Sequence, residues 1–142
     1  MRRNVCLAIH GHFYQPPREY AWTGKIEMQP SATPHHDWNE RITAECYEPL
    51  ANARLLDSEG RVSARQNLYE EISFDIGPTL LSWLRRKDVK TYEAILAADR
   101  ESVSKRNSHG NALAQIYNHV IMPLCDRRDK ISQVVWGIKD FE

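Results

Sequence analysis

The chain has 142 residues, and its 19 Lys and Arg residues are balanced by 19 Asp and Glu residues, so the formal net charge is zero. A neutral chain has no overall positive field to draw it to nucleic acid or to an anionic membrane, and neither partner is expected. The length suits one domain, and an apolar content of 42% is typical of a globular protein.

The first predicted element is the short apolar run that begins at Asn4, ends in His10-Gly11-His12 and is closed by Pro16-Pro17. A run of this length between breakers predicts a buried strand. Alternate strand residues face the same side, so both imidazoles are expected to point into one pocket. In α/β barrels and open α/β sheets, the ends of parallel strands carry the active site.

A long connection without regular structure is expected over residues 18–34, where prolines and polar residues are frequent. Asp37 then predicts a helix N-terminus, because an acidic residue, Glu40, follows three positions later as in a capping box. The helix is expected to run to about Tyr47 and to stop near Pro49. Residues 56–65 predict a turn or a short irregular segment.

The middle of the chain alternates between strand and helix signals. Residues 71–76 alternate as a second strand, and Gly77-Pro78 opens a helix over 79–86. Thr91 is expected to cap a further helix over 92–104, which a turn at 107–111 follows.

The last third of the chain is ambiguous at first and then clearly helical. Residues 112–124 are interpreted as a third strand, although a helix fits the same spacing. Asp126 or Asp129 is expected to start a final helix. Its apolar residues recur at helical spacing and predict a buried face: Ile131, Val134, Val135 and Ile138.

This order of elements predicts an α/β fold with a parallel sheet. Three strands are too few to close a barrel, and the last helix runs to Glu142 without a C-cap. Residues 1–142 are therefore interpreted as the N-terminal part of a larger domain.

Cysteine content and hydropathy suggest a cytoplasmic location. Cys6, Cys46 and Cys125 are odd in number and widely spaced, which argues against a disulfide framework. The apolar run after Met1-Arg2-Arg3 is too short for a signal peptide. No segment approaches the roughly 20 apolar residues of a membrane span.

His10 and His12 leave three interpretations open from local sequence. They could bind a metal, as in metal-dependent barrel hydrolases, hydrogen-bond the hydroxyls of a polar ligand, or be structural. His35 and His36 could extend a metal site with Asp37, but a helix cap beside loop histidines is the favoured interpretation. His119 lies in an apolar stretch, which by itself favours a structural role.

Aromatic residues and carboxylates give weaker signals. Trp22 and Trp38 lie in or beside the long loop and are candidate platforms for stacking a sugar, whereas Trp83 and Trp136 lie on predicted helices and suit packing. Glycoside hydrolysis needs two carboxylates, yet Asp75 and Glu40 have no local signature of that role. No Gly-rich phosphate loop and no G-x-S-x-G motif occurs.

Several of these stretches together resemble glycoside hydrolase family 57, whose members act on α-glucans through an incomplete seven-stranded barrel. Residues 10–16 resemble the first conserved region, an H-x-H closely followed by Gln-Pro, and residues 73–81 resemble the second-strand pattern S-F-N-x-x-P-x-L-L. Residues 117–124 resemble the second conserved region, in which a histidine precedes Pro-Leu by four positions. Residues 29–42 look like a bacterial branch of the family.

The resemblance implies an α/β fold that is the N-terminal portion of a (β/α)7 barrel of the glycoside hydrolase/deacetylase type, with about three β/α units in residues 1–142. It implies that His10, His12 and His119 line the subsite of the reacting sugar, beside Gln15 of the same motif. Together with the platform candidates Trp22 and Trp38, these are the candidate substrate-binding residues. No metal and no cofactor are expected.

The sequence departs from the family pattern in three ways. Phe13-Tyr14 separates His12 from Gln15, Asp75 stands where Asn is usual, and the catalytic Glu and Asp of the family would lie beyond Glu142. No residue here is assigned a catalytic role, so the chain is expected to be inactive by itself.

The predicted function is thus a part of a retaining glycoside hydrolase or glucanotransferase with an α-glucan or oligosaccharide partner. Two alternatives stay open: a metal-dependent barrel hydrolase or carbohydrate deacetylase with His10 and His12 as ligands, and a non-catalytic carbohydrate-binding or scaffold fragment. Self-association through uncovered barrel edges is also expected.

Overall fold

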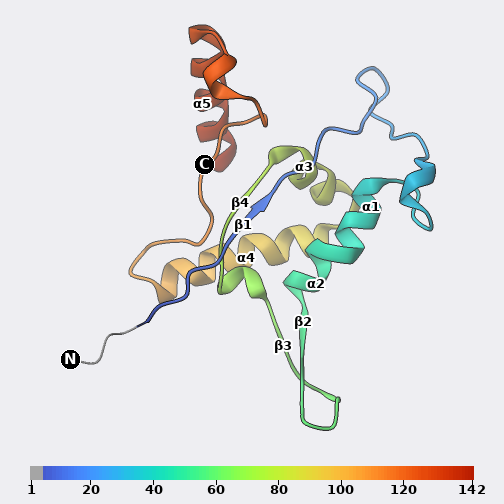
Figure 1. Ribbon diagram of the computed structural model, residues 1–142, viewed down its shortest axis with the longest axis vertical. Helices are drawn as coiled ribbons and strands as arrows, with labels where there is room; N and C mark the ends of the chain where they lie inside the picture. Colours follow the sequence, from blue (N-terminus) through green and yellow to red (C-terminus); the bar gives the residue numbers. More distant parts are fainter. Residues whose placement is uncertain (1–4) are drawn as a thin grey trace.

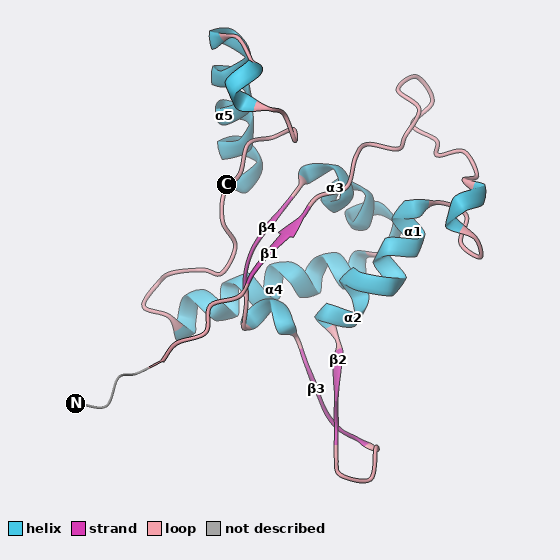
Figure 2. Ribbon diagram, viewed as in Figure 1, coloured by secondary structure: helices cyan, strands magenta, loops and turns pink. Residues whose placement is uncertain are grey.

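In the computed structural model, which describes residues 5–142, helices pack beside a small parallel sheet, and a second two-stranded sheet forms a hairpin (Figures 1 and 2). The strands are β1 (His10–Phe13), β2 (Ala53–Leu56), β3 (Val62–Gln66) and β4 (Ser73–Ile76). The α-helices are α1 (Trp38–Ile42), α2 (Glu48–Ala51), α3 (Pro78–Lys87), α4 (Val89–Lys105) and α5 (Arg127–Phe141). The expected mixture of helix and strand is therefore confirmed.

β1 and β4 pair in parallel, as expected from the order of the elements, and His12 lies opposite Asp75 in their register. The position predicted for the first strand was wrong, because β1 begins at His10 and the apolar residues before it are exposed. Val5 is 94% and Leu7 is 86% exposed. The partner strand β4 begins only at Ser73, opposite His10, and the Ser73 amide donates to the Ile9 carbonyl at 3.1 Å. Residues 5–8 therefore lie beyond the start of β4.

The third strand expected within 112–124 does not form, and neither does the alternative helix. Ala112 makes an isolated parallel bridge to Phe74, on the side of β4 away from β1. Its neighbours supply the hydrogen bonds: the Phe74 amide donates to the Asn111 carbonyl at 2.9 Å and the Leu113 amide donates to the Phe74 carbonyl at 2.7 Å. Further along, the Tyr117 amide donates instead to the Gln133 carbonyl on α5, which ends the sheet pairing.

An aromatic core lies on one face of the β1–β4 sheet. Phe13 contacts Tyr47, Tyr69 and Phe74 with ring centroids 5.4–6.4 Å apart. Helices α3 and α4 complete this core with the buried side chains Leu80, Trp83, Leu84, Ile95 and Ala98. Strand alternation sends His10, His12, Ser73 and Asp75 to the opposite face of the sheet. The core therefore fixes the strands that carry the histidines.

The helix after the long loop begins as predicted. The Asp37 carboxylate accepts hydrogen bonds from the amides of Asn39 (2.9 Å) and Glu40 (3.1 Å). The helical run ends at Ala51, two residues after the predicted stop at Pro49, because α1 continues through a π-helical turn (Thr43–Tyr47) into α2. A wider turn before Pro49 accommodates a ring without an N–H that would clash in a regular helix interior.

We expect Asp37→Ala to lower the free energy of unfolding by about 1 kcal/mol, because two amide donors at the start of α1 lose their acceptor. Urea titration at low protein concentration, followed by tryptophan fluorescence, measures the change. Glu93→Ala removes an exposed carboxylate of α4 and is the control. Equal stability of the two variants would contradict the capping role.

The hairpin β2–β3 projects from the helices (Figure 1). The turn at its tip was predicted, and Gly60 supplies the positive φ of 77° that this turn requires. The flanking strands were not predicted. Most of their side chains are exposed, so they lack the alternation of apolar and polar residues that marks a half-buried strand.

Helix α4 differs from expectation at its start, and helix α5 differs in the face that it buries. Helix α4 is capped by Asp88, whose carboxylate accepts from the Thr91 amide at 3.2 Å, so the prediction of Thr91 as the cap was wrong. Helix α5 starts after Asp126, one of the two predicted positions. Its predicted inward face is exposed, however, and its buried residues are Gln133 and Gly137.

Within residues 5–142, no helix combines the length and the apolar character needed to cross a bilayer.

Candidate functional site

The centre of the candidate site is Asp75, whose two carboxylate oxygens each bind a different histidine. His10 Nε2 lies 2.9 Å from Asp75 Oδ1, and His12 Nδ1 lies 2.5 Å from Asp75 Oδ2. The parallel register of β1 and β4 brings the three side chains to one face of the sheet. Asp75 is only 9% exposed, whereas about half of each imidazole is open to solvent. The carboxylate thus lies beneath two accessible rings.

Ser73 extends this cluster along β4. Its hydroxyl lies 3.0 Å from His10 Nδ1 and 3.3 Å from the Ile9 carbonyl. A hydrogen-bonded chain therefore runs from Ser73 through His10 and Asp75 to His12.

His119 joins the cluster from a distant part of the sequence. Its ring lies 5.2 Å from that of His12 and stacks on Tyr14 at 4.5 Å between centroids. The segment before His119 is held by α5: Gln133 binds the amides of Tyr117 and Asn118 through its carbonyl and its side chain. This anchoring brings the third predicted histidine beside the first two.

The remaining predicted site residues lie in other surroundings. Gln15 accepts a hydrogen bond from Arg18 through its side chain at 3.1 Å and from the Thr79 hydroxyl through its carbonyl. Trp22 is 88% exposed in the long loop, where it lines a shallow depression with Tyr20 and Met28.

Trp38 has local partners of its own. Its Nε1 donates to the Ser31 hydroxyl at 2.9 Å, and the Arg41 guanidinium lies 4.8 Å from the ring centroid. Because a cation covers one face of the ring, only the other could stack on a sugar. These contacts suit a packing role within the loop.

Sequence reasoning assigned no role to Asp75 or Tyr14. Strand alternation places Asp75 on the same face as Ser73, but only the register of β1 and β4 brings that face to His10 and His12. Tyr14 has no comparable signal, since its position depends on the fold of residues 117–120.

The donor atoms of the histidine cluster do not converge as the ligands of one metal ion would. Zn²⁺ ligands each lie about 2.0–2.3 Å from the ion, so their donor atoms lie close together. Among the described residues, three possible metal ligands do have their ligand atoms within 4.8 Å of one another, but they lie elsewhere: His36, Asp37 and Glu40. That group forms the start of α1: Asp37 caps the helix, and Glu40 accepts from the His36 amide.

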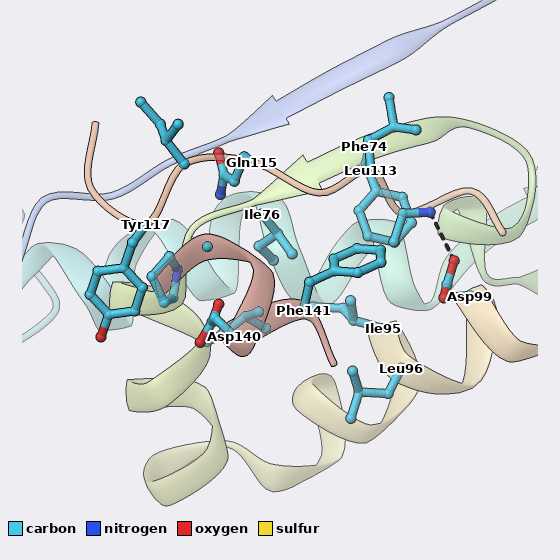
Figure 3. A pocket seen from close by; sticks show the side chains of 15 residues that line it. Phe74, Ile76, Ile95, Leu96, Asp99, Leu113, Gln115, Tyr117, Asp140 and Phe141 are labelled. Atoms are coloured by element: carbon cyan, nitrogen blue, oxygen red, sulfur yellow. Dashed lines mark hydrogen bonds between the residues drawn. The ribbon is translucent and has the colours of Figure 1, made fainter. Parts of the chain in front are cut away.

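A separate cavity of about 150 Å³ lies between β4, α3, α4 and α5 (Figure 3). Its lining is mainly apolar, with Phe74, Ile76 and Phe141 among the labelled residues. Burial raises the pKa of the Asp140 carboxyl at its edge. Since none of the predicted site residues lines it, this cavity is distinct from the histidine cluster.

No family model, curated protein or solved structure matches this chain.

Proposed function

We propose that the chain binds a sugar unit of an α-glucan at the cluster of His10, His12 and His119, as part of a glycoside hydrolase or glucanotransferase. The observation that carries the proposal is the ring contact between His119 and His12 at 5.2 Å. The resemblance to family 57 implies such a neighbourhood for histidines that are far apart in the sequence.

The strand arrangement supports a barrel as the parent fold. β4 lies between β1 and the bridge at Ala112, and both neighbours run parallel to it. Helices α3 and α4 connect β4 to that bridge. Parallel strands that follow one another in order, with helices between them, are the units from which βα barrels are built.

The chemistry of the cluster suits a neutral, hydroxyl-rich ligand. A neutral imidazole offers one donor and one acceptor nitrogen, and the Tyr14 ring, stacked on His119, places a further aromatic group beside them. Each oxygen of Asp75 faces a histidine, so the contacts of this carboxylate orient the two rings. The resemblance to family 57 places the catalytic Glu and Asp outside residues 1–142. We therefore expect binding without turnover.

Titration with maltotriose, followed by chemical shifts of backbone amides and histidine rings, tests this proposal. We expect His12→Ala to weaken binding about five- to tenfold, because one hydrogen bond is worth about 0.5–1.5 kcal/mol and a ring contact is lost as well. His109→Ala is the matched control, since His109 is exposed in the turn after α4. Shifts confined to other regions, or equal affinities of both variants, would contradict the proposal.

The metal-dependent alternative has less support, because among the described residues the ligand atoms of His10, His12 and Asp75 do not form a group within 4.8 Å of one another. A zinc titration distinguishes the two functions. Under the sugar-binding proposal Zn²⁺ leaves the ring resonances of His10 and His12 unchanged, whereas a metal site would shift both at equimolar metal.

We further propose that the chain associates with a second copy of itself. Apolar side chains that are 43–50% exposed lie together on α5: Ile131, Val134, Val135 and Ile138. Exposed apolar clusters and unpaired strand edges favour association.

A further inference from the structure

We infer that Asp75 is a positioning residue that fixes the tautomers of both strand histidines, so that His12, and not His10, presents a free acceptor nitrogen to the ligand. The part that concerns the ligand rests on the proposed sugar-binding function. The part that concerns the tautomers rests only on the contacts of Asp75.

An ionised carboxylate accepts hydrogen bonds and donates none. The nitrogens that face it, His10 Nε2 at 2.9 Å and His12 Nδ1 at 2.5 Å, must therefore both carry protons. Each neutral imidazole has a single N–H, so the opposite nitrogen of each ring becomes an acceptor. One buried carboxylate thereby determines the protonation pattern of two accessible rings.

The two acceptor nitrogens differ in what they contact. His10 Nδ1 lies 3.0 Å from the Ser73 hydroxyl, which also lies 3.3 Å from the Ile9 carbonyl. With the His10 proton on Nε2, Nδ1 is the acceptor, and the Ser73 hydroxyl donates to it rather than to the carbonyl. For His12 Nε2, no hydrogen bond is formed within residues 5–142. Both nitrogens of His10 thus have partners within the chain, Asp75 and Ser73. His12 has one partner, Asp75, and keeps Nε2 as an acceptor for a ligand hydroxyl.

The identity of residue 75 matters for this arrangement. An Asn side chain has one acceptor oxygen and one donor NH₂ group, so it can accept from only one of the two rings. The other ring would have to present an unprotonated nitrogen to residue 75 and move its proton to the opposite side. Asp75→Asn, which is nearly isosteric, therefore changes the tautomer of at least one histidine.

Long-range ¹H–¹⁵N spectra of the histidine rings test the inference at about pH 8.5, where an ordinary imidazole is neutral. In the unsubstituted chain we expect the proton of His12 on Nδ1 and that of His10 on Nε2. We expect Asp75→Asn to convert at least one ring to the opposite tautomer. Ser73→Ala is the matched control on the same strand face; it removes a partner of His10 but keeps Asp75, so both tautomers should persist.

A proton on His12 Nε2 in the unsubstituted chain would overturn the inference without any variant. Unchanged tautomers in Asp75→Asn would also overturn it. On addition of maltotriose we expect the ¹⁵N shift of His12 Nε2 to move while both nitrogens of His10 hold their positions; movement of the His10 nitrogens instead would refute the assignment of His12 as the contact. Predicted tautomers together with no response of any ring to maltotriose would uphold the positioning role and refute the sugar-binding function.

Discussion

Leu84→Ala is expected to lower the free energy of unfolding by about 2–5 kcal/mol. Leu84 lies on α3 and is fully buried in the core that also contains Tyr69, Phe74 and Ile95. Truncation removes apolar area from the core and leaves a cavity, because the helix is also held by its neighbours and closes the gap only in part. Small domains are stable by only about 5–15 kcal/mol, so this loss is a large fraction of the total.

Urea titration at low protein concentration measures this change, and the adjacent, buried Trp83 reports unfolding through its fluorescence. Leu124→Ala is the matched control, since Leu124 is 81% exposed and its truncation should stay within about 0.5 kcal/mol. A similar effect of the two substitutions would mean that the core is not assembled around Leu84.

The sequence predicted best those elements whose signals are local. Pro78 marks the start of α3, and Asp37 and Asp126 cap the helices that follow them, because these effects act within one helical turn. The pairing of β4 with β1 also agrees with the order of elements along the chain. The position of β1 was missed, because the apolar run before His10 contains no information about where its partner strand begins.

Burial on α5 was predicted in the wrong place for a similar reason. Apolar spacing identified the face that Ile131 and Val135 share, whereas the helix contacts the rest of the chain through Gln133 and Gly137. A Cβ at position 137 would overlap the Gln115 backbone, so this glycine permits the close approach. Neither a polar residue nor a glycine within an amphipathic helix signals a buried face by itself.

At the candidate site, the sequence predicted which residues share a face of a strand, but not which residues of another strand lie beside them. His10 and His12 were predicted to share one side, because strand alternation requires it, and they do. The resemblance to a family, and not the local sequence, grouped His119 with them. The central position of Asp75 depends on strand register, which short sequence patterns do not specify.

Val135→Lys combined with Ile138→Glu is expected to convert a self-associating chain into a monomer. Both side chains lie on the exposed apolar face of α5, 43% and 50% exposed, respectively. Complete burial of a Val or Ile side chain is worth about 1.5–3 kcal/mol, so covering the exposed half of each is worth about 1 kcal/mol. Both copies carry the two substitutions, so four such contributions, about 4 kcal/mol in all, are lost and association weakens about 700-fold. The desolvation of the introduced charges weakens it further.

Sedimentation velocity over a wide range of protein concentration measures this change. The helix itself should persist, because Lys and Glu have higher helix propensities than Val and Ile. Val89→Lys is the control: it replaces a valine of similar exposure, 48%, at the start of α4 and outside the apolar face of α5. We expect that variant to associate as the unsubstituted chain does. A chain that is already monomeric at high concentration, or that associates equally well with both charges on α5, would show that this face is not the contact between copies.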